Sequence, residues 1–188
     1  MGRMFRQLVS QLKRGHPHIP RIRRHAESLQ HGLSGCKRRL LGTTRKEVSP
    51  EHLKRLNKLY GVAPINGLFN EHVIEFAADG STSIKFSPKK EHCHSMGSLH
   101  GSGYFKLLDD AAFFAAQALD EENFIYTTSF NTYLVRAAAI GVPLISKGRV
   151  VSAGKTLQIA ESRLIEEETG KLVATGSGTF QKSPHKIK

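Results

Sequence analysis

Asp109 and Asp110 stand side by side in the segment from Leu99 to Leu119, where most other residues are apolar. A carboxylate in such surroundings costs free energy unless it is paired or has a chemical task. Adjacent helical residues point about 100° apart, so the two acids face different neighbours. We expect Asp110 to pair with Lys106, one turn earlier, at a wet edge of the helix. Asp109 points back toward Gly101 and is the candidate general base or nucleophile.

Three glycines lie around the start of the same segment, at Gly97, Gly101 and Gly103. Without side chains, they let backbone N–H groups at a helix start approach an anionic or polarised oxygen. The spacing therefore fits an oxyanion hole, and it fits equally a loop that needs glycine for a tight turn. A dinucleotide-binding loop is excluded, because the strand, glycine, helix, strand order and a ribose-binding acid are missing.

His92, Cys93 and His94 raise the question of a metal site or a cysteine nucleophile. In an extended segment, alternate side chains point to opposite sides, and no further ligand set follows at a suitable spacing. We therefore expect no metal. Adjacency in sequence does not make a catalytic Cys–His pair in space. His100 is expected to be a hydrogen-bonding residue at the helix start.

The elements that must position these residues follow from local patterns. Ser49-Pro50-Glu51 predicts the start of a short helix, and Asp79-Gly80 predicts a tight hairpin turn. The long helix follows, and four more strands come after it. The order predicts one α+β domain in which an antiparallel sheet wraps around a long central helix. The predicted strands are 71–78, 81–87, 124–135, 144–152, 156–166 and 172–182.

Positive charge is concentrated at the N-terminus. The 188 residues carry a formal net charge of +12, and residues 1–48 alone hold twelve Lys or Arg against two acids. Three hypotheses compete for this leader: a cleaved organellar presequence, a basic arm for nucleic acid, and a disordered or mis-annotated extension, which we favour. The folded domain is predicted at 49–188, and it is nearly neutral.

Composition also bears on the compartment. No window reaches the eighteen or more apolar residues of a membrane-spanning helix, and two cysteines cannot build a disulfide framework. We expect a cytoplasmic protein that binds neither membrane nor nucleic acid. The alternative is the mitochondrial matrix, should residues 1–48 be a presequence.

The motif Gly97-Ser-Leu-His-Gly101, followed by Leu108-Asp109 and a run of small residues, resembles the PaaI-like (phenylacetate-pathway type) hotdog acyl-CoA thioesterases. The resemblance spans about Pro50 to Lys182. It implies a hotdog fold, a homodimer or homotetramer with active sites at a shared interface, and hydrolysis of an acyl-CoA to free acid and coenzyme A without a cofactor. Further support comes from residues 131–136, 154–157 and 169–171.

The resemblance also implies roles. The acid at Asp109 attacks the thioester or activates water, and the backbone amide of Gly101 from the opposite subunit polarises the carbonyl. Such an amide is worth roughly 10² to 10³ in rate. A small hydroxyl residue that positions the water falls on Thr127, which we expect to share a strand face with Ser129 and Asn131.

Two positions depart from the family pattern. His94 stands where the family often has asparagine, and we predict that it acts as a neutral hydrogen-bond donor. The alternative is a titrating acid/base group. Ser102 replaces the second glycine of a His-Gly-Gly motif and, with His100, is expected beside the substrate.

Coenzyme A carries phosphates, so cations near the cleft should contact it. Candidate cations are Arg136, Lys147, Arg149 and Lys155, with Asn131 as a further substrate contact. Two other functions stay open on the same fold. A non-catalytic acyl-CoA sensor with a DNA-contacting leader is disfavoured by Asp109 and by the lack of a helix-turn-helix pattern. An enoyl hydratase or dehydratase would need a histidine and an acid at one enoyl site.

Overall fold

The computed structural model describes residues 47–69 and 73–187. The predicted leader lies outside the described residues, except for Glu47 and Val48. Val48 is buried, and its N–H donates to the carbonyl oxygen of Ala78 at 2.9 Å. The folded part therefore includes Val48.

The leading helix forms where the sequence predicts it. Helix α3 spans Pro50–Gly61, and the Ser49 hydroxyl caps it by accepting from the His52 N–H at 3.3 Å. Proline at the first helical position suits this start, because its missing N–H would have no partner there. The buried face of α3 meets the central helix, with the Tyr60 and Phe114 rings 5.1 Å apart. A 3-10 helix, η1 (Pro64–Leu68), follows.

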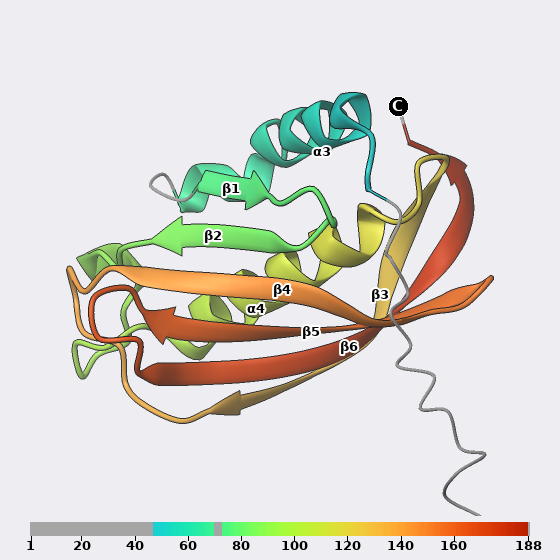
Figure 1. Ribbon diagram of the computed structural model, residues 1–188. Coiled ribbons are helices and arrows are strands. Elements are labelled where there is room, and N and C mark those ends of the chain that lie inside the picture. The colour runs from blue at the N-terminus through green and yellow to red at the C-terminus, as the bar shows by residue number, and fades with distance from the viewer. Residues whose placement is uncertain (1–46, 70–72, 188) are drawn as a thin grey trace, which may run out of the picture. The chain divides into compact units, whose positions relative to one another are not determined.

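Six strands form one antiparallel sheet in the order β1-β2-β4-β5-β6-β3 (Figure 1). The β1–β2 hairpin turns at Asp79-Gly80, where Gly80 has φ +81°, a left-handed conformation that favours glycine. The four strands predicted after the long helix are all present. The bounds are β1 Val73–Phe76, β2 Thr82–Phe86, β3 Asn123–Leu134, β4 Leu144–Ala153, β5 Leu157–Glu166 and β6 Leu172–Lys186.

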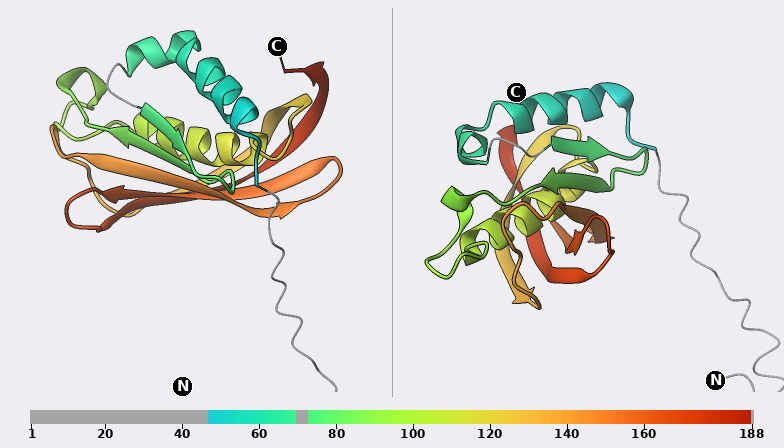
Figure 2. Two further views of the ribbon diagram at one scale, coloured as in Figure 1. Left: turned by 45° about the horizontal axis from the view of Figure 1, so that its top comes forward. Right: turned by 90° about the vertical axis from the view of Figure 1, so that its left-hand side faces the viewer.

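The central helix α4 spans Gly101–Gln117, and the sheet curves around it (Figures 1 and 2). The approach is close: a Cβ on Gly148 would lie 2.0 Å from the Ala111 carbonyl oxygen, which also accepts from the Thr82 hydroxyl at 2.6 Å. Small residues at this contact therefore fix the depth at which α4 sits. The observed fold is the predicted α+β sheet around one long helix.

The helix starts two residues later than the apolar run. Leu99 forms an isolated bridge with Cys93, and a short 3-10 helix, η2 (Lys90–His92), precedes that bridge. Across residues 47–69 and 73–187, no helix is long and apolar enough to cross a membrane.

Candidate active site

Asp109 and Thr127 meet between α4 and β3. The Thr127 hydroxyl donates to the Asp109 carboxylate, with 3.1 Å between Oγ1 and Oδ1. Both residues are half-buried. Burial raises the pKa of Asp109 from 3.8 to about 6. The hydrogen bond from Thr127 opposes this rise, because it stabilises the charged carboxylate. A carboxyl group with this pKa is largely ionised at neutral pH and remains a useful proton acceptor.

Local structure explains why Thr127 faces the helix. The buried Gln117 side chain, in the last turn of α4, accepts from the Ile125 N–H at 3.0 Å and donates to the Asn123 carbonyl oxygen at 2.9 Å. It thereby ties the start of β3 to the helix end. Sequence patterns did not single out Gln117, although a glutamine in an alanine-rich helix needs buried partners.

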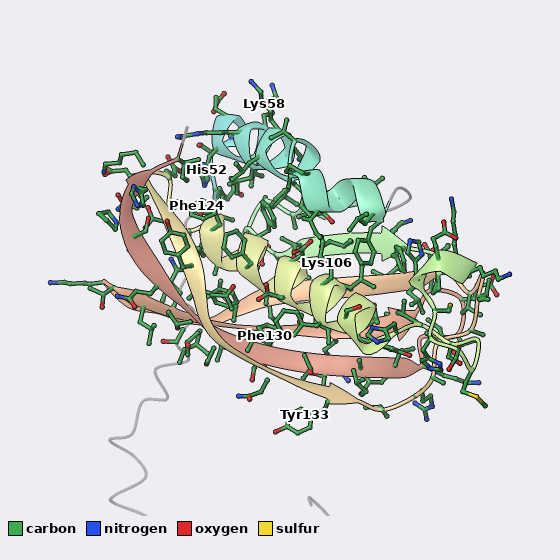
Figure 3. The ribbon with its side chains drawn as sticks, turned by 180° about the vertical axis from the view of Figure 1, so that it is seen from behind. His52, Lys58, Lys106, Phe124, Phe130 and Tyr133 are labelled. Carbon is green, nitrogen blue, oxygen red and sulfur yellow. The ribbon has the colours of Figure 1, made fainter. Side chains whose placement is uncertain are left out.

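A β-bulge corrects one expectation about β3. Thr127 pairs with Phe180 and Ser129 with Thr179, which leaves Thr128 as the extra residue and inverts the alternation. Past the bulge, Phe130 projects toward α4, its ring 5.6 Å from that of Phe105 (Figure 3). Ser129 and Asn131 therefore lie on the opposite face from Thr127, and the expectation of a shared face was wrong.

Asp110 has a different environment on the other side of α4. It forms the predicted ion pair with Lys106, whose Nζ also donates to the Asn66 Oδ1 at 2.8 Å. The pair is not at a wet edge, since its side chains are only 12% and 19% exposed for Lys106 and Asp110. The reason is that η1 covers it, and the Lys106 ammonium lies 5.6 Å from the centre of the Phe69 ring. Burial raises the pKa of Asp110, and Lys106 opposes the rise.

The start of α4 leaves one backbone N–H for a ligand. Gly101 is the first helical residue, so its N–H has no acceptor within the helix. The His100 side chain caps the next residue, because its Nδ1 accepts from the Ser102 N–H at 3.1 Å. The Gly103 N–H donates to the His100 carbonyl oxygen at 2.9 Å. Among the hydrogen bonds of the described residues, none uses the Gly101 N–H, and Gly101 is exposed.

His94 is held in the loop before α4. Its Nδ1 accepts from the Met96 N–H at 3.1 Å, so a neutral ring carries its proton on Nε2. The ring is exposed. This arrangement is compatible with the predicted role of a neutral donor.

His92 and Cys93 are engaged in local structure. The His92 Nδ1 accepts from the Lys89 N–H at 3.0 Å, and its Nε2 lies 2.9 Å from the Leu68 carbonyl oxygen. The Cys93 thiol donates to the Lys89 carbonyl oxygen at 3.2 Å. The part of the chain that the structure describes contains no group of three or more metal-ligating side chains.

Arg136 and Lys155 do not come together within one protomer. Arg136 follows β3 near the first turn of α4, where the Tyr104 hydroxyl donates to its carbonyl oxygen at 3.2 Å. Lys155 lies in the β4–β5 turn, level with the start of β3. About ten residues of extended strand, roughly 30 Å, separate Arg136 from Lys155 along the strand direction.

Tyr104 is a second residue that sequence reasoning missed, although a buried tyrosine hydroxyl usually needs a partner.

Lys147 and Arg149 lie on the outer face of the sheet. Both are exposed, and the Arg149 Nε donates to the Glu161 carboxylate at 2.8 Å. A cavity of about 570 Å³ on this face is lined by both cations. They are remote from α4, because the helix packs on the other face of the sheet.

Residues 96–173, which run from the loop before α4 into β6, match the family model described as the thioesterase superfamily. This segment of the chain is similar to the thioesterase superfamily. It is 27% identical over 103 residues to the acyl-coenzyme A thioesterase 13 of Homo sapiens, covering 55% of this chain and 74% of that protein. The protein of the same name from Mus musculus is 23% identical over 130 residues, covering 69% and 93%.

Solved thioesterase-superfamily structures share the fold. The PaaI protein of the E. coli phenylacetic acid degradation operon superposes with a TM-score of 0.68 at 16% identity, covering 75% of this chain and 99% of that one. Zebra fish thioesterase superfamily member 2 gives a TM-score of 0.62 at 21% identity, covering 72% and 98%. The hotdog fold and the PaaI-like resemblance are thus confirmed.

Proposed function

We propose that this thioesterase hydrolyses an acyl-CoA to the free acid and coenzyme A, with Asp109 as the acid at the reacting centre. The Thr127–Asp109 pair carries the proposal, because it joins a half-buried carboxylate of raised pKa to a hydroxyl that can hold a water. The substrate class comes from the relatives named acyl-coenzyme A thioesterase 13.

The chemistry uses water as the second substrate. With Asp109 as general base, the water oxygen attacks the thioester carbonyl carbon while the carboxylate takes a proton. The C–S bond then breaks, and the proton passes to the departing thiolate. With Asp109 as nucleophile, its carboxylate oxygen attacks the carbonyl carbon, the C–S bond breaks and coenzyme A leaves as the thiolate, which gives an acyl-enzyme anhydride. Water then hydrolyses the anhydride, releasing the acid and its proton and restoring the carboxylate. In both routes the Gly101 N–H stabilises the negative charge on the carbonyl oxygen, which is greatest in the transition state.

The two groups must come from different protomers. Gly101 and Asp109 are eight residues apart on α4, which is about 12 Å along a helix. One carbonyl cannot contact both, so we propose a dimer in which each α4 start meets the partner's Asp109. Strand β3 is an edge strand of the sheet and carries an exposed apolar end, with Tyr133 67% exposed (Figure 3). An edge of this kind invites pairing with a second copy.

Subunit mixing tests the shared site. Inactive Asp109→Asn protein mixed with protein inactivated by Gly101→Pro, which removes the N–H, should recover part of the native turnover. As the control, each variant is dissociated and reassembled separately, without the other. Mixtures that stay inactive although mass spectrometry shows mixed oligomers would rule out a site shared between protomers. A dimer and a tetramer are both compatible with the fold, and native mass spectrometry also distinguishes them.

His94, His100 and Ser102 are proposed as supporting residues at the start of α4. His94 Nε2–H can donate to the carbonyl or the water, while His100 and Ser102 hold the helix start in place. The expected effect of His94→Ala is a loss of about 5- to 150-fold in kcat/KM, from one missing hydrogen bond. His94→Asn should retain most of the activity. If His94→Asn abolishes turnover, His94 is instead an acid/base group.

Cation roles in coenzyme binding are proposed for Arg136 and Lys155. Asn131 is a weaker candidate for a polar contact, because the β3 bulge places it on the outer face. The separation of the two cations within one protomer means that a single coenzyme contacts both only across the interface. Lys147 and Arg149 lie on the outer face and are the weaker candidates. Arg136→Gln and Lys155→Gln should raise KM more than they lower kcat, and unchanged KM values would remove both residues from the site.

The deciding experiment measures thiol release from a panel of acyl-CoAs by purified full-length protein. Turnover that Asp109→Asn abolishes supports the proposal. Tight acyl-CoA binding without turnover would instead favour a sensor, and hydration of an enoyl-CoA would favour a hydratase. We place the enzyme in the cytoplasm, with the mitochondrial matrix as the alternative, which subcellular fractionation would distinguish.

Residues 1–46 are proposed to be dispensable for catalysis, because every proposed site residue lies downstream. Protein beginning at Glu47 keeps Val48 in the core and should form the same active oligomer. Aggregation or a monomeric state of the shortened protein would show that the leader is structural.

A further inference from the structure

A cavity of about 510 Å³ opens beside the first turn of α4. His100, Ser102 and Gly103 form the wall on the helix side, and Ile65, Leu68 and Phe69 form the wall on the η1 side. Segments that are far apart in sequence therefore enclose one space next to the proposed oxyanion donor.

From this cavity we infer that the enzyme binds the acyl group of its substrate between η1 and α4 and selects short- to medium-chain apolar acyl groups. The inference rests on the proposed function, because the Gly101 N–H fixes the position of the carbonyl. His100 and Ser102 flank Gly101 and line the cavity, so a carbonyl at Gly101 lies at the cavity edge. The acyl group can enter from there.

The lining chemistry favours an acyl group over the coenzyme. Ile65 is 49% exposed and Leu68 66% exposed, so both gain from burial against an apolar ligand. Lys106 lines the cavity, but its positive charge is paired with Asp110. Glu91 contributes a negative charge to the cavity wall. A coenzyme with several phosphate charges is therefore disfavoured here.

The Lys106–Asn66 hydrogen bond sets the length limit. It joins α4 to η1 at 2.8 Å and thereby bridges the two walls of the cavity at Lys106. Ser102 and Lys106 are four residues apart, which is about 6 Å along the helix. An acyl chain that enters at Ser102 reaches this bridge after about one helical turn, and a longer chain must leave the cavity.

The test compares acetyl-CoA, hexanoyl-CoA and palmitoyl-CoA with the full-length enzyme. Each methylene that enters the cavity should raise kcat/KM about fourfold, and the gain should stop at the bridge. Hexanoyl-CoA should therefore exceed acetyl-CoA by at least tenfold, and palmitoyl-CoA should bring no further gain.

Two substitutions address the cavity itself. Ile65→Trp fills it and Leu68→Asp places a charge at its wall, so each should lower the hexanoyl-to-acetyl ratio of kcat/KM at least tenfold. Both positions are exposed, so the fold tolerates the changes. Val62→Trp, at a position that is 65% exposed and outside the cavity, is the matched control and should keep the native ratio.

The outcomes separate the two proposals. Hydrolysis with a ratio that Ile65→Trp and Leu68→Asp leave unchanged overturns the cavity assignment and preserves the proposed function. Palmitoyl-CoA turned over at least tenfold better than hexanoyl-CoA overturns the length limit. Native protein that hydrolyses none of the three substrates overturns the proposed function and the acyl assignment with it.

Discussion

Asp109 and Asp110 are neighbours on α4, yet the two sides of the helix give them different partners. Asp109 faces β3, where its contact is a neutral hydroxyl at 3.1 Å. Asp110 faces η1, where it is paired with an ammonium. A charge paired with Lys106 is held for structure, whereas a charge with one neutral donor can still accept a proton. We propose that the partner, more than burial, distinguishes a structural acid from a chemical one in this helix.

The largest expected effect separates the two acids by rate. Asp109→Asn should lower kcat by roughly 10² to 10⁴, because the amide keeps the volume but cannot accept the proton. Asp110→Asn should lower kcat less than tenfold. Single-turnover thiol release on variants of equal oligomeric state measures both, and the reverse order would mean that Asp110 is the reacting acid.

Stability should respond with opposite signs. The pKa of Asp109 is about 6 in the folded protein, against an ordinary value of 3.8, so ionising this carboxyl group costs the native state free energy as the pH rises between these two values. Asp109→Asn removes that cost and should stabilise the protein by about 2 to 3 kcal/mol at pH 7.5, and by almost nothing below pH 4.

Asp110→Asn should destabilise the protein at pH 7.5, by about 1 to 3 kcal/mol, because Lys106 loses its counter-charge while remaining largely buried. Urea denaturation of both variants at the two pH values gives the comparison. Equal shifts for the two variants would contradict the distinction between a paired and an unpaired acid.

The smallest expected effect refines the Asp109 side. Thr127→Val removes a hydrogen bond that lowers the pKa of Asp109, so the acid limb of kcat/KM should move above about pH 6. The loss of activity should then be greater at pH 6 than at pH 8. Thr127→Ser keeps the hydroxyl and serves as the control. If the acid limb of kcat/KM lies at the same pH in Thr127→Val as in the native protein, Thr127 does not influence the pKa of Asp109.

Much of the fold follows from short-range patterns that the structure retains. The Ser49 cap, the Asp79-Gly80 turn and the apolar period of α4 depend on neighbours within a few residues. For the same reason, the four-residue spacing of Lys106 and Asp110 predicts their pairing. The family resemblance implies that Thr127 positions the water, and its contact with Asp109 is consistent with that role.

Other features could not be predicted, because they depend on contacts between distant segments. The bulge at Thr128 moves Asn131 to the outer face, and no local pattern in β3 marks the inserted residue. The sequence likewise gave no sign that η1 covers the Lys106–Asp110 pair, since Asn66 and Lys106 are forty residues apart. The separation of Arg136 from Lys155 follows from the strand register.

The sequence by itself determined which residues could do chemistry and which elements carry them, because side-chain type, helical period and turn residues act over a few positions. Only the tertiary structure decided which candidates meet. Packing of α4 against β3 brings Thr127 to Asp109, packing of η1 against α4 buries the neighbouring acid, and the strand register sets the distances between the cations. Those contacts arise from how sheet and helices bury their apolar faces together, which depends on the whole chain.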